Sequence, residues 1–214
     1  GDKVIKLESM QVSAKNIEAA VNEAIDKFNV DKSEVSYRII QEPSKGFFGI
    51  GGKMAVLEVY LNENYLTNRV KEFMEDILKY FDENFTTSIK IHNRNIVIYL
   101  DGEGLGKLIG KHGRTLGALQ HLIMIYVNRM TDTKVDIKLD IGEYRKKRRR
   151  KIEEIAEQAS KKVIEENTSL ELAPMFSFER KMVHEYISKN YPQLKTKSTG
   201  LEPYRKVYIY LGDN

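Results

Sequence analysis

Leu105-Gly-Lys-Leu-Ile-Gly-Lys-His-Gly-Arg-Thr-Leu116 is the stretch on which the fold of this 214-residue chain depends. It contains a Gly-x-x-Gly loop, Gly110-Lys111-His112-Gly113, between a short apolar turn and a longer helical pattern. Glycine has no Cβ, so the loop can turn tightly and another backbone can approach it closely. The helix that begins at Arg114 would present unpaired backbone N–H groups and the positive end of its dipole. Such a site suits phosphate, and its candidate contacts are Lys107, Gly110, Lys111, His112, Gly113 and Arg114.

The segments around this loop alternate between strand and helix patterns. Two strand-like runs precede it, Ser88–His92 and Asn95–Leu100, and a third, Val135–Ile141, follows. Apolar residues at helical spacing predict one helix before the strands and one after the loop: Val70, Phe73, Met74, Ile77, Leu78 and Phe81, then Leu116, Leu119, Ile123 and Tyr126. The order helix, strand, strand, helix, loop, helix, strand resembles the bacterial (type II) KH domain, whose GXXG loop grips single-stranded nucleic acid. The other interpretation is a glycine-rich connector, and the order of elements favours the KH domain.

Composition narrows the classes of protein. Hydrophobic residues make up 41% of the chain, which suffices for packed cores, and 31% of the residues are charged. The absence of cysteine excludes disulfides and thiolate-bound zinc, and the four histidines show no metal-ligand pairing. We therefore predict no metal and no cofactor. No apolar run is long enough for a transmembrane segment and no targeting signal precedes Lys3, so we expect a cytoplasmic protein.

The net charge of +4 is distributed unevenly. Residues 1–62 carry eight Lys or Arg against nine Asp or Glu, and residues 63–142 carry eleven of each. Residues 143–214 carry sixteen basic against eleven acidic residues. A polyanionic partner is therefore expected to contact the last third of the chain.

Residues 1–62 predict a strand–helix–strand–strand module. The strands are expected at Lys3–Met10, Val35–Ile40 and Met54–Leu61, and Ser13 is the expected cap of a helix with an apolar stripe. The stretch Lys45-Gly-Phe-Phe-Gly-Ile-Gly-Gly-Lys53 joins the last two strands. It is no Walker loop, because Met54 follows Gly-Lys where Ser or Thr is required. Its Phe47, Phe48 and Ile50 either pack into the module or form an exposed protein-docking surface.

Residues 143–214 begin with the basic run Tyr144-Arg-Lys-Lys-Arg-Arg-Arg-Lys151, which includes Arg148, Arg149 and Arg150. Apolar residues at helical spacing follow, so the run is predicted to open a structured helix. A later helix carries Arg180 and His184 four residues apart, on one face. With Ser198, Gly200, Pro203 and Arg205 in the tail, these residues resemble the Arg-x-x-x-His (R-3-H) domain, which binds single-stranded nucleic acid. Lys181 stands where relatives often carry a second Arg.

The chain is thus predicted to be α+β, with three small modules in series: 1–62, 63–142 and 143–214. The Lys45–Lys53 stretch resembles the signature of the Jag N-terminal domain, and the three modules in this order resemble the Jag family, also called KhpB, EloR or SpoIIIJ-associated. The resemblance implies a non-enzymatic regulator of cell elongation, envelope synthesis and division that binds single-stranded RNA. It also implies a small KH-only partner, KhpA.

The sequence is compatible with several alternatives. Single-stranded DNA is an alternative ligand, because no residue identifies a reader of the 2′-hydroxyl. A homodimer is an alternative assembly. A nuclease that uses these modules to hold its substrate and a protein-interaction scaffold are the alternative functions, although the carboxylates Asp101, Glu103, Asp136 and Asp140 form no recognisable metal motif.

Overall fold

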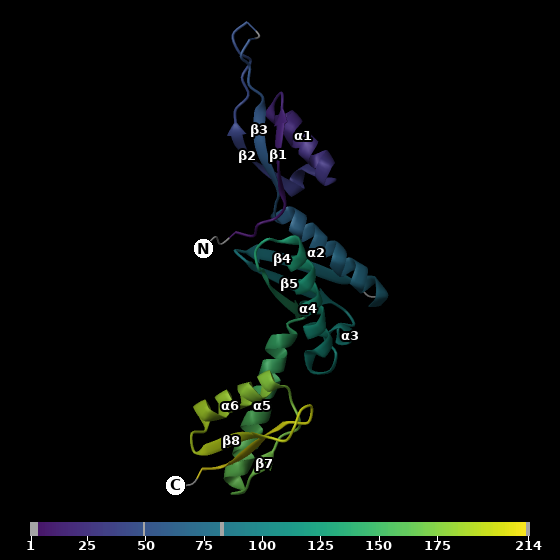
Figure 1. Cartoon of the computed structure of the whole chain (residues 1–214). Coiled ribbons are helices and arrows are strands. Elements are labelled where there is room, and N and C mark those ends of the chain that lie inside the picture. Colours follow the sequence, from purple (N-terminus) through teal and green to yellow (C-terminus); the bar gives the residue numbers. More distant parts are fainter. Residues whose placement is uncertain (1–3, 49, 82–83, 213–214) are drawn as a thin grey trace. The chain divides into compact units, whose positions relative to one another are not determined.

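The computed structural model describes residues 4–48, 50–81 and 84–212 (Figure 1). These residues form two compact units, 1–142 and 143–214, and three separate three-stranded sheets. Each sheet is accompanied by helices from the same stretch of sequence. The prediction of an α+β protein with three small modules in series is confirmed.

The first sheet has the order β1-β3-β2 and is antiparallel throughout. It consists of β1 (Ser9–Ala14), β2 (Val35–Gln41) and β3 (Ala55–Leu61), and α1 (Ile17–Phe28) packs against it. Alternate residues of β3 point inward, so Ala55, Leu57 and Val59 are fully buried against α1.

Two predictions at the start of this module are wrong. The first strand is Ser9–Ala14 and not Lys3–Met10, of which Lys3 lies outside the described residues. Ile5 and Leu7 are buried, which explains the apolar–polar alternation, but the backbone of Lys6 bonds to Asp132 and Thr133 and joins no strand. The cap of α1 is Asn16, whose Oδ1 accepts from the Ala19 N–H at 2.8 Å. Ser13 lies within β1, where it is paired with Val56 of β3, before the helix begins at Ile17.

The second sheet belongs to the segment that contains the Gly-x-x-Gly loop. Strands β4 (Phe85–His92), β5 (Asn95–Gly102) and β6 (Asp136–Ile141) lie in that order, with β4 and β5 antiparallel and β5 and β6 parallel. Helices α2 (Glu63–Leu78), α3 (Gly106–Ile109) and α4 (Arg114–Met130) complete the segment. The predicted order of elements is confirmed. The core is dense: Ile96, Ile98, Leu100, Leu139 and Ile141 are fully buried.

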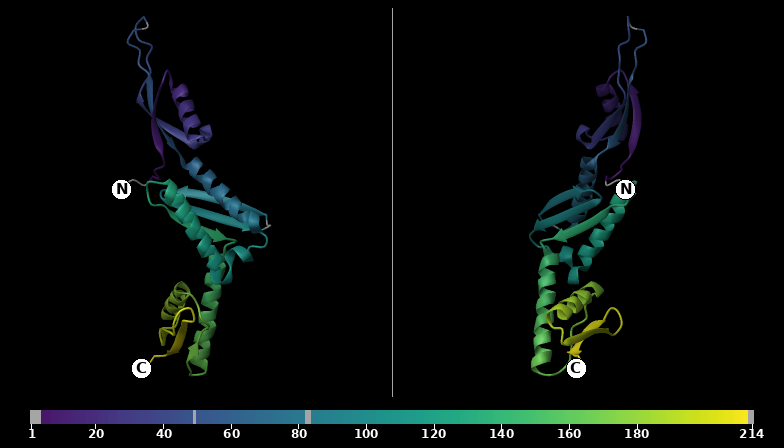
Figure 2. Two further views of the ribbon diagram at one scale, coloured as in Figure 1. Left: turned by 45° about the vertical axis from the view of Figure 1, so that its right-hand side comes forward. Right: turned by 90° about the vertical axis from the view of Figure 1, so that its left-hand side faces the viewer.

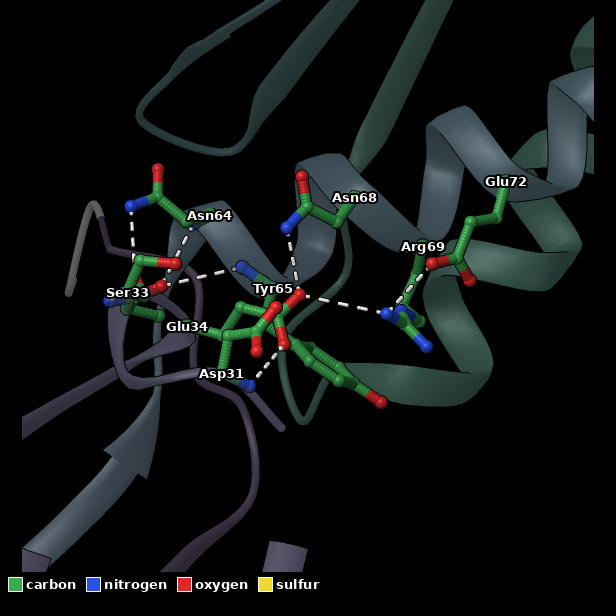
Figure 3. A network of polar contacts seen from close by, with 9 residues as sticks. Asp31, Ser33, Glu34, Asn64, Tyr65, Asn68, Arg69 and Glu72 are labelled. Atoms are coloured by element: carbon green, nitrogen blue, oxygen red, sulfur yellow. Dashed lines mark hydrogen bonds and ion pairs between the residues drawn. The ribbon is translucent and has the colours of Figure 1, made fainter. Parts of the chain in front are cut away.

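A polar network joins the first module to α2 (Figure 3). Its centre is the carboxylate of Glu34, at the end of the short helix η1 (Lys32–Glu34). The side chain of Glu34 is 3% exposed. Glu34 accepts from Asn68 Nδ2 at 2.8 Å and from the Asp31 N–H at 3.0 Å, and Arg69 lies 3.6 Å away. A buried carboxylate is costly unless such donors surround it, so the network holds η1 against α2.

The third sheet, β7-β9-β8, is antiparallel. It consists of β7 (Leu170–Glu171), β8 (Leu194–Thr199) and β9 (Lys206–Leu211), and it packs against α5 (Tyr144–Glu165) and α6 (Ser177–Asn190) (Figure 2). The core of this module includes Ile152, Ala156, Val183, Val207 and Ile209, all at most 1% exposed. Among the residues that the structure describes, no helix is both long enough and apolar enough to span a membrane.

Candidate nucleic-acid interface

The Gly110–Gly113 loop adopts backbone angles that side chains disfavour. Gly110 has φ 70° and ψ 178°, a region that essentially only glycine occupies, and a Cβ there would collide with the side chain of Thr115. Gly113 has φ 81° and His112 has φ 55°. The two glycines therefore allow α3, the short helix η3 (Lys111–Gly113) and α4 to follow one another with almost no linker.

The loop presents positive charge beside the beginning of a long helix. Helix α4 has 17 residues, and its N-cap is Gly113, which has no side chain to bind the first N–H groups. Its first turn contains no acidic residue. Lys111, Arg114 and Lys107 are exposed and His112 is half-buried. The N-terminal backbone of α4, the positive end of its dipole and these cations together suit a phosphate of a nucleic-acid backbone.

The three arginines of the basic run occupy different environments on α5. Arg148 Nε donates to Glu179 Oε1 at 2.8 Å, and the Glu179 side chain is fully buried. The other oxygen of Glu179 accepts from the Phe176 N–H at 3.0 Å. Arg149 and Arg150 are exposed. One arginine thus fastens α5 to α6, while its two neighbours project into solvent.

Arg180 and His184 lie on one face of α6, but both side chains are engaged within the module. Arg180 is 5% exposed; its Nη1 donates to the carbonyl of Met175 at 2.7 Å and its Nη2 to Glu202 at 2.7 Å. The ring of His184 lies between two β8 hydroxyls, with Nδ1 2.6 Å from Thr196 Oγ1 and Nε2 3.0 Å from Ser198 Oγ.

Burial lowers the pKa of His184 below its ordinary value, and the nearby guanidinium of Arg180 lowers it further. The ring is therefore neutral at physiological pH. One of its nitrogens then donates and the other accepts, which matches two hydroxyl partners that can do either.

The tail residues predicted to join the site lie in and beside β8 and the segment that follows it. Ser198 contacts His184, and Gly200 has φ 82°, a left-handed conformation that favours glycine. Arg205 is exposed, and its backbone carbonyl accepts from the Met175 N–H at 3.2 Å. Arg180 and His184 thus both hold the β8 and tail region against α6, and Arg205 extends from that region.

In the first module, the interpretation in which Phe47, Phe48 and Ile50 pack into the core is wrong. Their exposed fractions are 82%, 92% and 80%. Antiparallel bridges pair Phe47 with Ile50 and Ser44 with Lys53, so the three side chains lie at the end of a narrow hairpin that extends from β2 and β3 (Figure 1). An exposed apolar tip of this kind is compatible with docking to a partner.

Sequence reasoning missed two features. It did not find the Arg148–Glu179 pair, because nothing local to either helix links residues 31 positions apart. It also overlooked Leu122 and Ile125 of α4, which are 50% and 40% exposed and whose i, i+3 spacing was a usable signal. In residues 4–48, 50–81 and 84–212, no three His, Asp or Glu side chains come together in a way that could hold a metal ion.

Three family models match the chain in sequence. The Jag N-terminus matches residues 12–61, the KH domain of KhpA/KhpB matches residues 68–141, and the R-3-H domain matches residues 150–211. The RNA-binding protein KhpB of Clostridium symbiosum is 31% identical over 207 residues, 96% of this chain and 92% of the relative. KhpB of Bacillus subtilis (strain 168) is 27% identical over 91% of this chain and 94% of its own length.

These two relatives align with all three modules, so the similarity extends beyond any one domain. The order Jag N-terminus, KH domain and R-3-H domain is also the order of the three sheets along the chain. The chain belongs to the KhpB (Jag) family.

Proposed function

We propose that this protein binds single-stranded RNA and that the Gly110–Gly113 loop holds the RNA backbone. One observation carries the proposal: the loop combines two glycines at positive φ, an exposed Lys111 and the N-terminus of α4, which has no acidic first turn. The relatives from Clostridium symbiosum and Bacillus subtilis are named RNA-binding proteins, which supports RNA over DNA as the ligand.

The third module supplies a second, electrostatic contribution in this proposal. Arg149, Arg150 and Arg205 are exposed and contact phosphates directly. Arg148, Arg180 and His184 act as positioning residues, since each is bound to a partner within the module. We also propose that residues 1–62, 63–142 and 143–214 are the three functional modules.

Two docking surfaces are part of the same proposal. The hairpin tip of Phe47, Phe48 and Ile50 binds a protein partner, and the exposed Leu122 and Ile125 of α4 bind a second KH domain. The KH-only protein KhpA is the proposed partner at α4, and self-association into a homodimer would use the same face. Regulation of cell elongation, envelope synthesis and division from the cytoplasm is proposed from the family resemblance.

The test of RNA binding is the double variant Lys111→Asp/His112→Asp. Two carboxylates would repel the phosphates that the loop holds, while a surface loop tolerates the polar exchange. We expect RNA affinity to fall at least about tenfold, with an unchanged thermal melt. The charge-preserving variant Lys111→Arg is the control and should bind like the original protein. Unchanged affinity of the double variant would refute the proposed role of the loop.

The alternative functions are separated by two further measurements. Labelled RNA incubated with Mg²⁺ or Mn²⁺ should remain intact, because progressive cleavage would instead identify a nuclease. RNA affinity should fall steeply with salt concentration, since phosphate contacts release counterions. A scaffold whose basic helix binds an acidic protein would show little RNA affinity at any salt concentration.

A further inference from the structure

The outer face of the third sheet carries two tyrosines side by side. In β9, Val207 and Ile209 are fully buried against the helices, so the intervening Tyr208 and Tyr210 point to the opposite face of the sheet. Strand β9 is the central strand, and the two ring centroids are 5.5 Å apart. Both residues are half-buried, which leaves part of each ring accessible.

Lysines surround these rings. Lys195 is paired directly with Tyr210 and Lys197 with Tyr208, so both lysines share the outer face. The ammonium of Lys197 lies 5.2 Å from the centre of the Tyr208 ring and 5.7 Å from that of Tyr210. Lys206 lies on the same face with Glu171, its ion-pair partner at 3.1 Å. The face is therefore aromatic at its centre and net positive around it.

The first ring is held in place. The hydroxyl of Tyr208 donates to Ser169 Oγ at 2.7 Å, which fixes the orientation of the ring before any ligand binds. Lys197 is exposed and its stem is flexible, so its ammonium can leave the rings for a phosphate. A flat ligand would then take the position of the cation over the rings.

We propose that Tyr208, Tyr210 and Lys197 form a second RNA-contact surface, on which single-stranded bases stack. Proteins bind single strands by combining aromatic side chains, on which bases stack, with positive groups along the backbone. Some RNA-binding domains use aromatic residues of an open sheet in this way. The surface lies on the face of the sheet opposite to Thr196 and Ser198, which contact His184, and is thus separate from the Arg180–His184 pair. The inference rests on the proposed RNA binding and adds a base-stacking site to it.

Crosslinking with the unaltered full chain gives the direct test. The probe is a short single-stranded oligoribonucleotide of mixed sequence that carries iodouridine, which crosslinks to aromatic side chains in contact with the base. Trypsin cleaves after Lys206, so Tyr208 and Tyr210 lie together in a peptide that begins at Val207, and residues 207–214 contain no other aromatic residue. We expect this peptide to carry crosslinked nucleotide. Crosslinks confined to other peptides would overturn the inference.

Substitutions give the quantitative test. Tyr208→Ile and Tyr210→Ile keep a strand-forming residue but remove the ring, and each should weaken RNA binding about fivefold or more. Tyr210→Phe keeps the ring and should bind within about twofold of the original protein. Tyr60→Ile, an exposed strand tyrosine of the first module, is the matched control and should have no effect.

The outcomes distinguish this inference from the proposed function. If the isoleucine variants bind normally while Lys111→Asp/His112→Asp loses affinity, the sheet surface is wrong and RNA binding by the loop stands. If the original protein binds no single-stranded RNA, both are wrong.

Discussion

The Gly110–Gly113 loop and the Arg180–His184 pair are equally prominent as sequence motifs, but their side chains serve different purposes. At the loop, the glycines set the backbone and Lys111 remains exposed. At the pair, Arg180 is buried against Met175 and Glu202, and His184 contacts two hydroxyls of β8. The fold leaves the charge of Lys111 exposed in the first motif, whereas both side chains of the second motif make contacts within their own module.

The basic run of α5 repeats this contrast between adjacent residues. Arg148 compensates a buried carboxylate, whereas Arg149 and Arg150 project into solvent. A positively charged side chain therefore contributes to ligand binding only where the fold leaves its charge available. The charge excess of residues 143–214 does not separate these two environments, because it counts Arg148, Arg149 and Arg150 alike.

The largest effect is expected from a substitution at Gly110, in the Gly110–Gly113 loop. Gly110→Ala puts a Cβ into the side chain of Thr115, at φ and ψ angles that only glycine adopts readily. We expect a loss of about 2–4 kcal/mol of unfolding free energy and at least about tenfold weaker RNA binding. Urea unfolding and RNA titration measure the two effects.

The matched control is Gly117→Ala, in the exposed part of α4, where an added Cβ meets open space. Alanine favours a helix interior, so this variant should gain about 0.5–1 kcal/mol. If both alanine variants are equally stable and bind RNA equally well, the special backbone of the loop has no bearing on function.

The second prediction separates Arg148 from its neighbours. Arg148→Gln removes the ion pair that Arg148 makes with the buried Glu179, so we expect a loss of about 2–4 kcal/mol in stability. Arg149→Gln with Arg150→Gln should leave stability within about 0.5 kcal/mol. The same double variant should flatten the dependence of log affinity on log salt by up to about one unit for each lost contact. Equal salt slopes in the double variant and the original protein would show that Arg149 and Arg150 make no phosphate contacts.

The order of strands and helices was predictable because period-2 and period-3.6 patterns are local properties of the chain. The Gly110–Gly113 loop was predictable for the same reason, since its geometry depends on the glycines themselves. The partners of Arg180 were not predictable. Sequence proximity offers Arg180 two carboxylates on its own helix, Glu179 and Glu185. In the structure, however, Glu179 bonds to Arg148, Glu185 pairs with Lys181, and Arg180 reaches Glu202. Contacts across 22 positions depend on how β8 and the tail fold back onto α6.

The third prediction tests this structural role of Arg180. Arg180→Ala removes a donor from the Met175 carbonyl and from Glu202, so stability should fall by about 1–3 kcal/mol. RNA affinity of the folded protein should stay within about twofold. Lys181→Ala is the control, because this neighbour is exposed and its surface pair with Glu185 is worth at most about 0.5 kcal/mol. If Arg180→Ala bound RNA more weakly at unchanged stability, Arg180 would instead contact RNA directly.

The smallest predicted effect is the pH dependence caused by His184. Its pKa in the folded protein is below the ordinary value of about 6.5, because burial disfavours the charged ring and Arg180 repels it. As pH falls below about 6.5, the unfolded chain takes up a proton that the folded chain resists. Above that pH, His184 therefore does not lower the stability of the third module. Stability decreases as pH falls from about 6.5 toward the lowered pKa. Urea unfolding of the full chain, followed by the NMR signals of Val207 and Ile209, measures this decrease.

His184→Gln keeps hydrogen-bonding capacity toward Thr196 and Ser198 but does not titrate, so this part of the pH dependence should disappear. His121→Gln makes the same exchange at an exposed position of α4 and should leave the dependence at Val207 and Ile209 in place. A direct phosphate contact by protonated His184 predicts a different result: RNA affinity would rise on acidification, because a phosphate favours the charged ring that burial disfavours in the free protein. An affinity rise that His184→Gln abolishes, with no change in stability, would contradict the positioning role. On acidification, the positioning role thus predicts a loss of stability, whereas the contact role predicts a gain in RNA affinity.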